Sequence, residues 1–199
     1  MNVYDFDKTI FTGDCEDYFF AYLFKTRGMR LHHIRYTIAE RLFKLGLLSK
    51  TRSREIQYCF LKNVGDLDAL LEDYWDQHEK YMMDWYLQVK QPTDVIATGS
   101  PRFLMEPILH RLGLNNMVAT EMDRKTGKIT GKFAVYQYKK QYFAEQYDLN
   151  DIDNFYSDDH SDHFLAESAK HAYVVHDGGQ VSEWYDYFET HTFKKLYIV

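Results

Sequence analysis

Two acidic residues near the start of the chain, Asp5 and Asp7, have a spacing that indicates chemistry. They lie in the run Asp5-Phe6-Asp7-Lys8-Thr9, directly after a short apolar segment that is predicted to form a strand over Asn2 to Phe6. Two carboxylates this close raise each other's pKa and favour a cation between them. A hard divalent ion with oxygen ligands, beside a carboxylate that attacks phosphorus, accounts for the pair. An acidic surface turn is the alternative interpretation.

Three later segments carry side chains that suit the same chemistry. They are the apolar run Val95-Ile96-Ala97 with Thr98-Gly99-Ser100-Pro101 after it, the pair Lys139-Lys140, and Phe155-Tyr156-Ser157 followed by Asp158-Asp159-His160-Ser161-Asp162. Hydroxyl and ammonium groups stabilise a phosphoryl group, and carboxylates at a strand end bind a hard cation.

In this order the four segments resemble motifs I to IV of the haloacid dehalogenase superfamily, in particular its phosphoserine-phosphatase-like branch. The resemblance spans nearly the whole chain. A lone D-x-D is weak evidence, whereas D-x-D-x-T, T-G-S-P, Lys and D-x-x-x-D in sequence are strong. The resemblance implies a magnesium-dependent phosphatase that hydrolyses a small phosphomonoester through an aspartyl-phosphate.

The resemblance also implies a role for each acidic residue. Asp5 is the expected nucleophile, and Asp7 the expected general acid, which later activates water as a base. Mg²⁺ is expected to bind the Asp5 carboxylate, the Asp7 backbone carbonyl and Asp158. Asp162 is expected to reach the water shell of the metal or to hold the lysine, and Asp159 stays open as its alternative in this motif.

The remaining motif residues are expected to bind the phosphoryl group. Thr98 ends an apolar run where the family places its hydroxyl, and the Gly99 N–H can approach a phosphate oxygen. Ser100 is a second hydroxyl candidate, with capping of the following helix as its alternative role. Lys139 is expected to neutralise the phosphoryl group and hold the nucleophile, and Lys140 stays open as the alternative lysine.

Asp14 is the candidate substrate contact. Phosphoserine phosphatases of this branch have a Glu nine residues after the nucleophile that engages the substrate amine, and here that position is Asp14. Capping of the next helix is the alternative role for Asp14. The substrate therefore stays open between phosphoserine, another phosphorylated amine or alcohol, and a lipid head group.

Two other functions remain alternatives to hydrolysis. A phosphotransferase or phosphomutase of the same superfamily would use the aspartyl-phosphate with an alcohol in place of water. A catalytically silent member would bind a phosphorylated ligand.

The strands and helices predicted around these residues indicate an α/β fold. Residues 1–14 and 91–199 are expected to form a doubly wound parallel-sheet core, and residues 15–90 a small helical cap inserted after the first strand. Helices are predicted in the cap over Glu16–Lys25, Met29–Leu48, Arg52–Lys62 and Leu67–Val89. Strands are predicted in the core over Asp94–Thr98, Asn154–Ser157 and Ala172–His176, and helices over Arg102–Leu112, Tyr142–Tyr147 and Phe164–Lys170. Extended segments are predicted over Met117–Glu121 and Ile129–Val135, on either side of a hairpin-like turn at Lys125-Thr126-Gly127-Lys128.

Composition narrows the expected partners. The 199 residues carry a net charge of −6, which argues against nucleic acid as a partner. His32-His33 with Arg30 and Arg35 is interpreted as a solvated helix face, or alternatively as a basic rim that attracts an anionic substrate. Two cysteines form no disulfide framework, and no apolar run is long enough to insert stably in a membrane. A cytoplasmic protein is expected, and its oligomeric state is left open.

Overall fold

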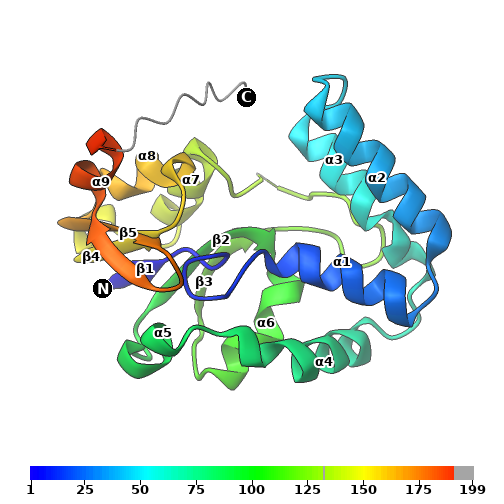
Figure 1. The fold of residues 1–199 in the computed structure, drawn as a ribbon, viewed down its shortest axis with the longest axis horizontal. Coiled ribbons are helices and arrows are strands. Elements are labelled where there is room, and N and C mark those ends of the chain that lie inside the picture. The colour runs from blue at the N-terminus through cyan, green and yellow to red at the C-terminus, as the bar shows by residue number, and fades with distance from the viewer. Residues whose placement is uncertain (132, 191–199) are drawn as a thin grey trace.

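The computed structural model describes residues 1–131 and 133–190, and its centre is a six-stranded sheet (Figure 1). The strands are β1 (Asn2–Tyr4), β2 (Val95–Pro101), β3 (Asn116–Thr120), β4 (Asn154–Ser157), β5 (His171–His176) and β6 (Gln180–Glu183). Their order is β3-β2-β1-β4-β5-β6, in which only β6 runs antiparallel to its neighbour. Because strand order proceeds outward in both directions from β1, the predicted doubly wound α/β fold is confirmed.

Helices fill the long connection between β1 and β2. They are α1 (Cys15–Thr26), α2 (Arg30–Lys44), α3 (Lys50–Gln57), η1 (Tyr58–Asn63), α4 (Leu67–His78), η2 (Glu79–Tyr81) and α5 (Asp84–Val89). The side chains of Asp14, Ser49 and Asp66 accept backbone N–H groups at the starts of α1, α3 and α4. These polar residues are N-caps, and they fix the positions at which the three helices begin.

The other helices follow single strands. They are α6 (Arg102–Arg111), α7 (Gln137–Ala144), η3 (Leu149–Asp151), η4 (His160–Asp162), α8 (His163–Ala166) and α9 (Trp184–Thr190). Figure 1 shows α7, α8 and α9 on one side of the sheet, and α6 with α4 on the other. No helix in the described part of the chain is both long and apolar enough to span a bilayer.

Each face of the sheet contributes side chains to its own buried apolar cluster. Along β1, Val3 belongs to one cluster and Tyr4 to the other, and along β2 Val95 and Ile96 divide in the same way. Successive strand residues point to opposite faces, and parallel strands covered on both faces are apolar throughout. The site residues therefore gather at the strand ends, where the apolar runs stop.

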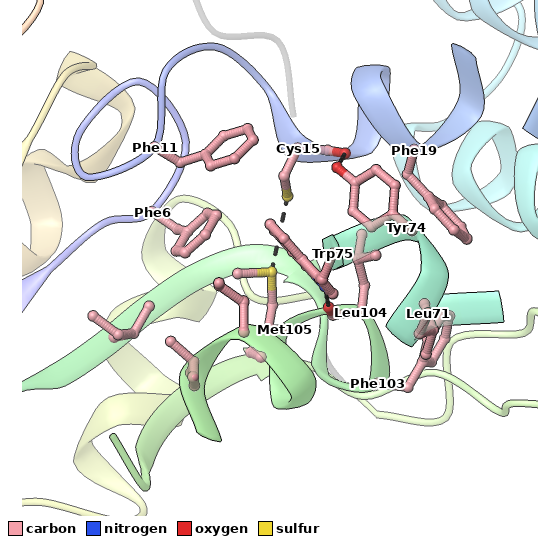
Figure 2. Close-up of a cluster of buried hydrophobic side chains, with 14 of the residues drawn as sticks. Phe6, Phe11, Cys15, Phe19, Leu71, Tyr74, Trp75, Phe103, Leu104 and Met105 are labelled. Atoms are coloured by element: carbon pink, nitrogen blue, oxygen red, sulfur yellow. Dashed lines mark hydrogen bonds between the residues drawn. The ribbon is translucent and has the colours of Figure 1, made fainter. Parts of the chain in front are cut away.

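One of these clusters fixes the start of α1 (Figure 2). The Tyr74 hydroxyl donates to the Cys15 carbonyl at 2.8 Å, and the Cys15 thiol lies 3.8 Å from the Met105 sulfur. Trp75 Nε1 donates to the Leu104 carbonyl at 2.7 Å. Helices α1, α4 and α6 are thereby tied together just after the Asp5 to Asp7 turn.

The prediction of a single long helix over Leu67–Val89 is wrong. Helix α4 ends at His78, and α5 begins only at Asp84. Between them, Thr12 N donates to Tyr81 O and Met83 N donates to Ile10 O, both at 2.8 Å. The loop after β1 therefore takes up backbone groups that a continuous helix would use.

The extended segment predicted over Ile129–Val135 forms no strand of the sheet among the described residues, but the hairpin-like turn before it is present. Met122 and Ile129 form an isolated antiparallel bridge, and the N–H groups of Asp123 and Thr130 donate to Lys128 O and Glu121 O at 2.8 and 3.0 Å. The Thr120 hydroxyl accepts the Ala134 N–H at 3.1 Å, so a side chain replaces the ladder partner. The helix predicted over Tyr142–Tyr147 begins earlier, at Gln137, directly after Tyr136 with its φ of 53°.

Candidate active site

The ends of β1, β2 and β4 bring the predicted residues to one edge of the sheet. β1 pairs with β2 on one side and with β4 on the other, all in parallel. Asp5 follows β1, and its N–H donates to the Tyr156 carbonyl of β4 at 2.8 Å. Carboxyl ends of parallel strands share one edge, which is where ligands bind in open α/β sheets.

Asp5 is a buried carboxylate with a cationic partner. Lys139 Nζ lies 2.9 Å from Asp5 Oδ1, and both side chains are almost fully buried. Burial raises the pKa of Asp5 to about 6, with the ammonium of Lys139 opposing this rise and Asp162 adding to it. The ammonium of Lys139 thus favours the ionised form of Asp5 and fixes the orientation of its carboxylate. Both effects suit a carboxylate that attacks phosphorus.

Lys139 joins Asp5 to the last motif. Its Nζ lies 2.7 Å from Asp162 Oδ2, which also accepts the Ser157 hydroxyl at 2.8 Å. Burial alone would lower the pKa of Lys139, but Asp162 and Asp5 together raise it above its ordinary value. The lysine is therefore a permanent cation held between two acids.

Asp7 contacts Ser100, one of the residues expected to bind the phosphoryl group, and the first residue of α1. Its Oδ2 accepts the Ser100 hydroxyl at 3.1 Å, and its Oδ1 accepts the Cys15 N–H at 2.6 Å. Burial, then Asp14 and Asp5, raise the pKa of Asp7 well above its ordinary value. A carboxyl group whose pKa is raised in this way is suited to give a proton to a leaving oxygen.

Thr98 and Gly99 lie on β2, the strand that pairs with β1 on the side away from β4. The Thr98 side chain is fully buried, and its Oγ1 accepts the Ser100 N–H at 3.1 Å. The Gly99 carbonyl accepts the Thr120 hydroxyl at 2.6 Å. A Cβ on Gly99 would lie 3.0 Å from Val135 Cγ1, so glycine lets the following loop approach closely.

Asp158 supplies a third acid near Asp5. Burial and then Asp5 raise the pKa of Asp158 to about 8, while Lys8 opposes the rise. Lys8 adopts a φ of 56°, in the tight turn between the two acids of the first motif. Carboxylates that oppose each other's ionisation in this way are stabilised by a cation.

The donor chemistry of this edge fits Mg²⁺. The Asp5 and Asp158 carboxylates and the Asp7 backbone carbonyl are all hard oxygen donors. Within residues 1–131 and 133–190, no three His, Cys, Asp or Glu side chains form a metal-binding group on their own. The expected ligand set is of another kind, because one of its protein ligands is a backbone oxygen.

The open alternatives in the motifs occupy different places. Lys139 points into the acidic cluster, whereas the neighbouring Lys140 is half-buried on another side of α7. Asp162 contacts Lys139, whereas Asp159 accepts the Ser161 N–H at 2.7 Å at the start of η4. Of the two roles expected for Asp162, the geometry therefore places it on the lysine.

Asp14 takes the helix-capping position. Its Oδ1 accepts the N–H groups of Glu16 and Asp17 at 3.0 and 3.1 Å. Its other carboxylate oxygen is not part of that cap. The Asp14 carboxylate also raises the pKa of Asp7, so the two acids lie near each other.

Capping gives Asp14→Ala an expected cost in stability. We expect the variant to lose about 1 kcal/mol of unfolding free energy, because two N–H groups of the first turn lose their acceptor. Asp14→Asn should stay close to wild type, since Asn caps about as well. Chemical denaturation of the three proteins measures the difference. Equal losses in both variants would show that the charge, not the cap, matters.

Three contacts at this edge were not anticipated from the sequence. They are the Cys15 N–H on Asp7, the Ser157 hydroxyl on Asp162, and the Thr9 hydroxyl that donates to Asp5 Oδ2 at 3.4 Å. Ser157 had a usable signal, because it is the polar end of the apolar run that precedes the last acids.

Comparison with protein families identifies the fold and family. The family model described as haloacid dehalogenase-like hydrolase matches residues 3–167. The search of curated proteins gave no match.

Several solved structures share the fold. A protein of unknown function from Bordetella pertussis Tohama I is 20% identical with a TM-score of 0.75, covering 86% of this chain and 87% of that one. A HAD family hydrolase from Salmonella enterica serovar Typhi is 18% identical with a TM-score of 0.63, over 84% and 59% of the chains. A probable phosphoserine phosphatase from Vibrio cholerae is 13% identical with a TM-score of 0.61, over 88% and 56%.

Proposed function

This chain belongs to the haloacid dehalogenase-like hydrolase family, and on that premise we propose that it is a magnesium-dependent phosphatase. Its substrate would be a small phosphomonoester, hydrolysed through an aspartyl-phosphate. The observation that carries the proposal is the buried Asp5 carboxylate, 2.9 Å from Lys139, with Asp7, whose pKa burial raises, two residues away. The probable phosphoserine phosphatase among the structures of similar fold is consistent with this class of substrate.

Two steps follow from these positions. In the first, an Asp5 oxygen bonds to phosphorus, the bond from phosphorus to the leaving oxygen breaks, and Asp7 gives that oxygen its proton. In the second, Asp7 removes a proton from water, which bonds to phosphorus and releases Asp5. Lys139, Thr98 and the Gly99 N–H would hold the phosphoryl oxygens throughout.

The metal would be held by Asp5, Asp158 and the Asp7 backbone carbonyl. When bound, Mg²⁺ supplies positive charge that offsets the phosphoryl oxygens and the neighbouring acids. Asp162 would act through Lys139, which it holds at 2.7 Å.

We assign catalysis and the selection of the leaving group to two different parts of the chain. Residues 1–14 and 91–199 would form the catalytic core, of which 132 and 191–199 lie outside the described residues. Residues 15–90 would form the helical cap that selects the leaving group. Asp14, at the junction of the two, would be its first polar contact through the oxygen that α1 does not use.

The test is hydrolysis of p-nitrophenyl phosphate with and without magnesium. We expect activity to vanish in excess chelator and to return with Mg²⁺. Asp158→Ala should raise the Mg²⁺ concentration for half-maximal rate roughly tenfold or more, since affinity follows the charge of the ligands. Full activity in chelator would contradict the proposal. A faster release of nitrophenol when an alcohol is added, with phosphate appearing on the alcohol, would instead identify a phosphotransferase.

A further inference from the structure

Helices α2 and α3 form a projecting arm with an unusual charge. Figure 1 shows the two helices side by side, extending away from the sheet; we call residues 30–57 the arm. The arm contains seven Lys and Arg residues and two Glu residues, a net charge of +5 in a chain whose total is −6. Such a separation of charge gives this end of the molecule a positive potential of its own.

The arm also carries a row of exposed apolar side chains. Leu31, Ile34, Ile38, Leu45 and Leu47 are between 52% and 71% exposed. The first four recur at intervals of three, four and seven residues, which places them on one side of α2. These are large aliphatic residues at positions where a solvated helix face would carry polar ones.

This row is not the face by which α2 packs on the protein. Ala39 is buried, and the Tyr36 ring lies 4.7 Å from the Phe20 ring of α1. Helical positions 36 and 39 point well away from positions 31, 34 and 38. Helix α2 therefore has two apolar faces, and the outer one is exposed among the described residues.

Basic side chains flank the outer face. Arg30, Arg41 and Lys44 are exposed along α2, with Lys44 3.7 Å from Glu40. Arg35 lies at the other edge of the row and, with Arg52, Lys62 and Lys128, lines a hollow of about 280 Å³. The acid in that lining, Glu55, is paired with Arg52 at 3.1 Å. The hollow is thus positively charged overall.

We propose that the arm docks on the surface of a bilayer that contains anionic lipid. A helix with aliphatic residues on one face and Lys and Arg beside them lies in the membrane interface, with its apolar face among the acyl chains. The basic side chains would then meet the lipid phosphates, and the hollow has the charge to take one head group. Docking of this kind is peripheral and needs no spanning helix.

Other occupants fit the arm less well. A symmetric dimer through this face would bring two arms of charge +5 together, which is repulsive. A nucleic acid would use the basic residues but would leave the row of Leu and Ile without a role.

The experiment is flotation of the full chain with vesicles of phosphatidylcholine, with and without phosphatidylglycerol. We expect binding only to the anionic vesicles, weakened by salt. Leu31→Ser/Ile34→Ser/Ile38→Ser should lower the partition coefficient at least about tenfold, because the inserted apolar surface is lost. The matched control is Leu87→Ser/Val89→Ser, which changes exposed apolar residues of α5 outside the arm.

A second pair of variants tests the charges. Arg41→Glu should weaken binding by roughly tenfold, and Lys80→Glu, an equal change outside the arm, should not. All four variants should hydrolyse p-nitrophenyl phosphate like wild type, so the result stands apart from the proposed activity. Absence of binding to anionic vesicles, or equal binding by the Ser variant, would overturn the proposal. A concentration-dependent dimer lost in the Ser variant, or RNA binding lost only in Arg41→Glu, would assign the arm to those partners instead.

Discussion

Asp5→Asn is expected to lower the rate of phosphomonoester hydrolysis at least about a thousandfold, as removal of a covalent nucleophile does in other hydrolases. An amide cannot attack phosphorus, and it brings no negative charge to a metal. The fold should survive, because Asn has the shape of Asp and its carbonyl can accept the hydrogen bond from Lys139. Stability should even rise slightly, since a buried acid with a pKa raised to about 6 is removed from beside Asp162.

The measurement is the initial rate on p-nitrophenyl phosphate in saturating Mg²⁺, together with thermal unfolding. Asp153→Asn is the matched control, because Asp153 pairs with Lys170 just before β4, at the end of that strand away from Asp158. Retention of more than a few per cent of the wild-type rate by a folded Asp5→Asn would remove Asp5 from the nucleophile's role.

The Asp7→Asn variant separates the formation of the aspartyl-phosphate from its hydrolysis. Nitrophenolate leaves without needing a proton, so the first step should persist while the activation of water fails. Intact-mass measurement after rapid acid quenching should then find one phosphoryl group on Asp7→Asn and none on Asp5→Asn.

The position of this site was predictable because of where polarity begins in each apolar run. Asp5 follows β1, Thr98 follows the apolar run in the first half of β2, and Asp158 follows β4. Strand ends in a parallel sheet share an edge, so a linear pattern of apolar runs ending in polar residues already brings these three together. The sheet was predicted for the same reason, since Val95-Ile96-Ala97 is apolar without interruption.

The features that escaped prediction depend on contacts between distant segments. The break at 79–83 depends on the loop after β1, whose backbone groups at Ile10 and Thr12 bond to it. The choice between Lys139 and Lys140, which the sequence left open, depends on Asp5 and Asp162, which lie 134 and 23 residues from Lys139 along the chain. Periodicity within a window carries no information about such partners.

The arm illustrates the same limit of prediction from the sequence. The basic residues Arg30 and Arg35 were visible in the sequence and were interpreted as a solvated face. What the sequence did not reveal is that Ile34 and Ile38 lie outside the packed face of α2. A helix with apolar residues on two faces is ambiguous until its neighbours are placed.

Lys139→Ala is expected to lose at least about a hundredfold in hydrolysis rate, the scale seen when a preorganised donor to a developing charge is removed. Lys140→Ala should stay close to wild type, because adjacent helical residues point about 100° apart and only Lys139 reaches Asp5. Lys139→Ala should also lose roughly 3 kcal/mol of unfolding free energy, since Asp5 and Asp162 keep their buried charges without the cation between them.

Loss of stability and loss of catalysis can be separated through Asp162. The double variant Lys139→Ala/Asp162→Asn removes one of the two unpaired acids, so its stability should recover while its activity does not. Denaturation curves in chelator and initial rates in Mg²⁺ for the two single variants and the double variant complete the cycle. Recovery of both quantities together would mean that Lys139 only holds the fold. Equal and mild losses for Lys139→Ala and Lys140→Ala would mean that neither lysine meets the phosphoryl group, and the positive charge in the site would then have to come from the metal and from backbone N–H groups alone.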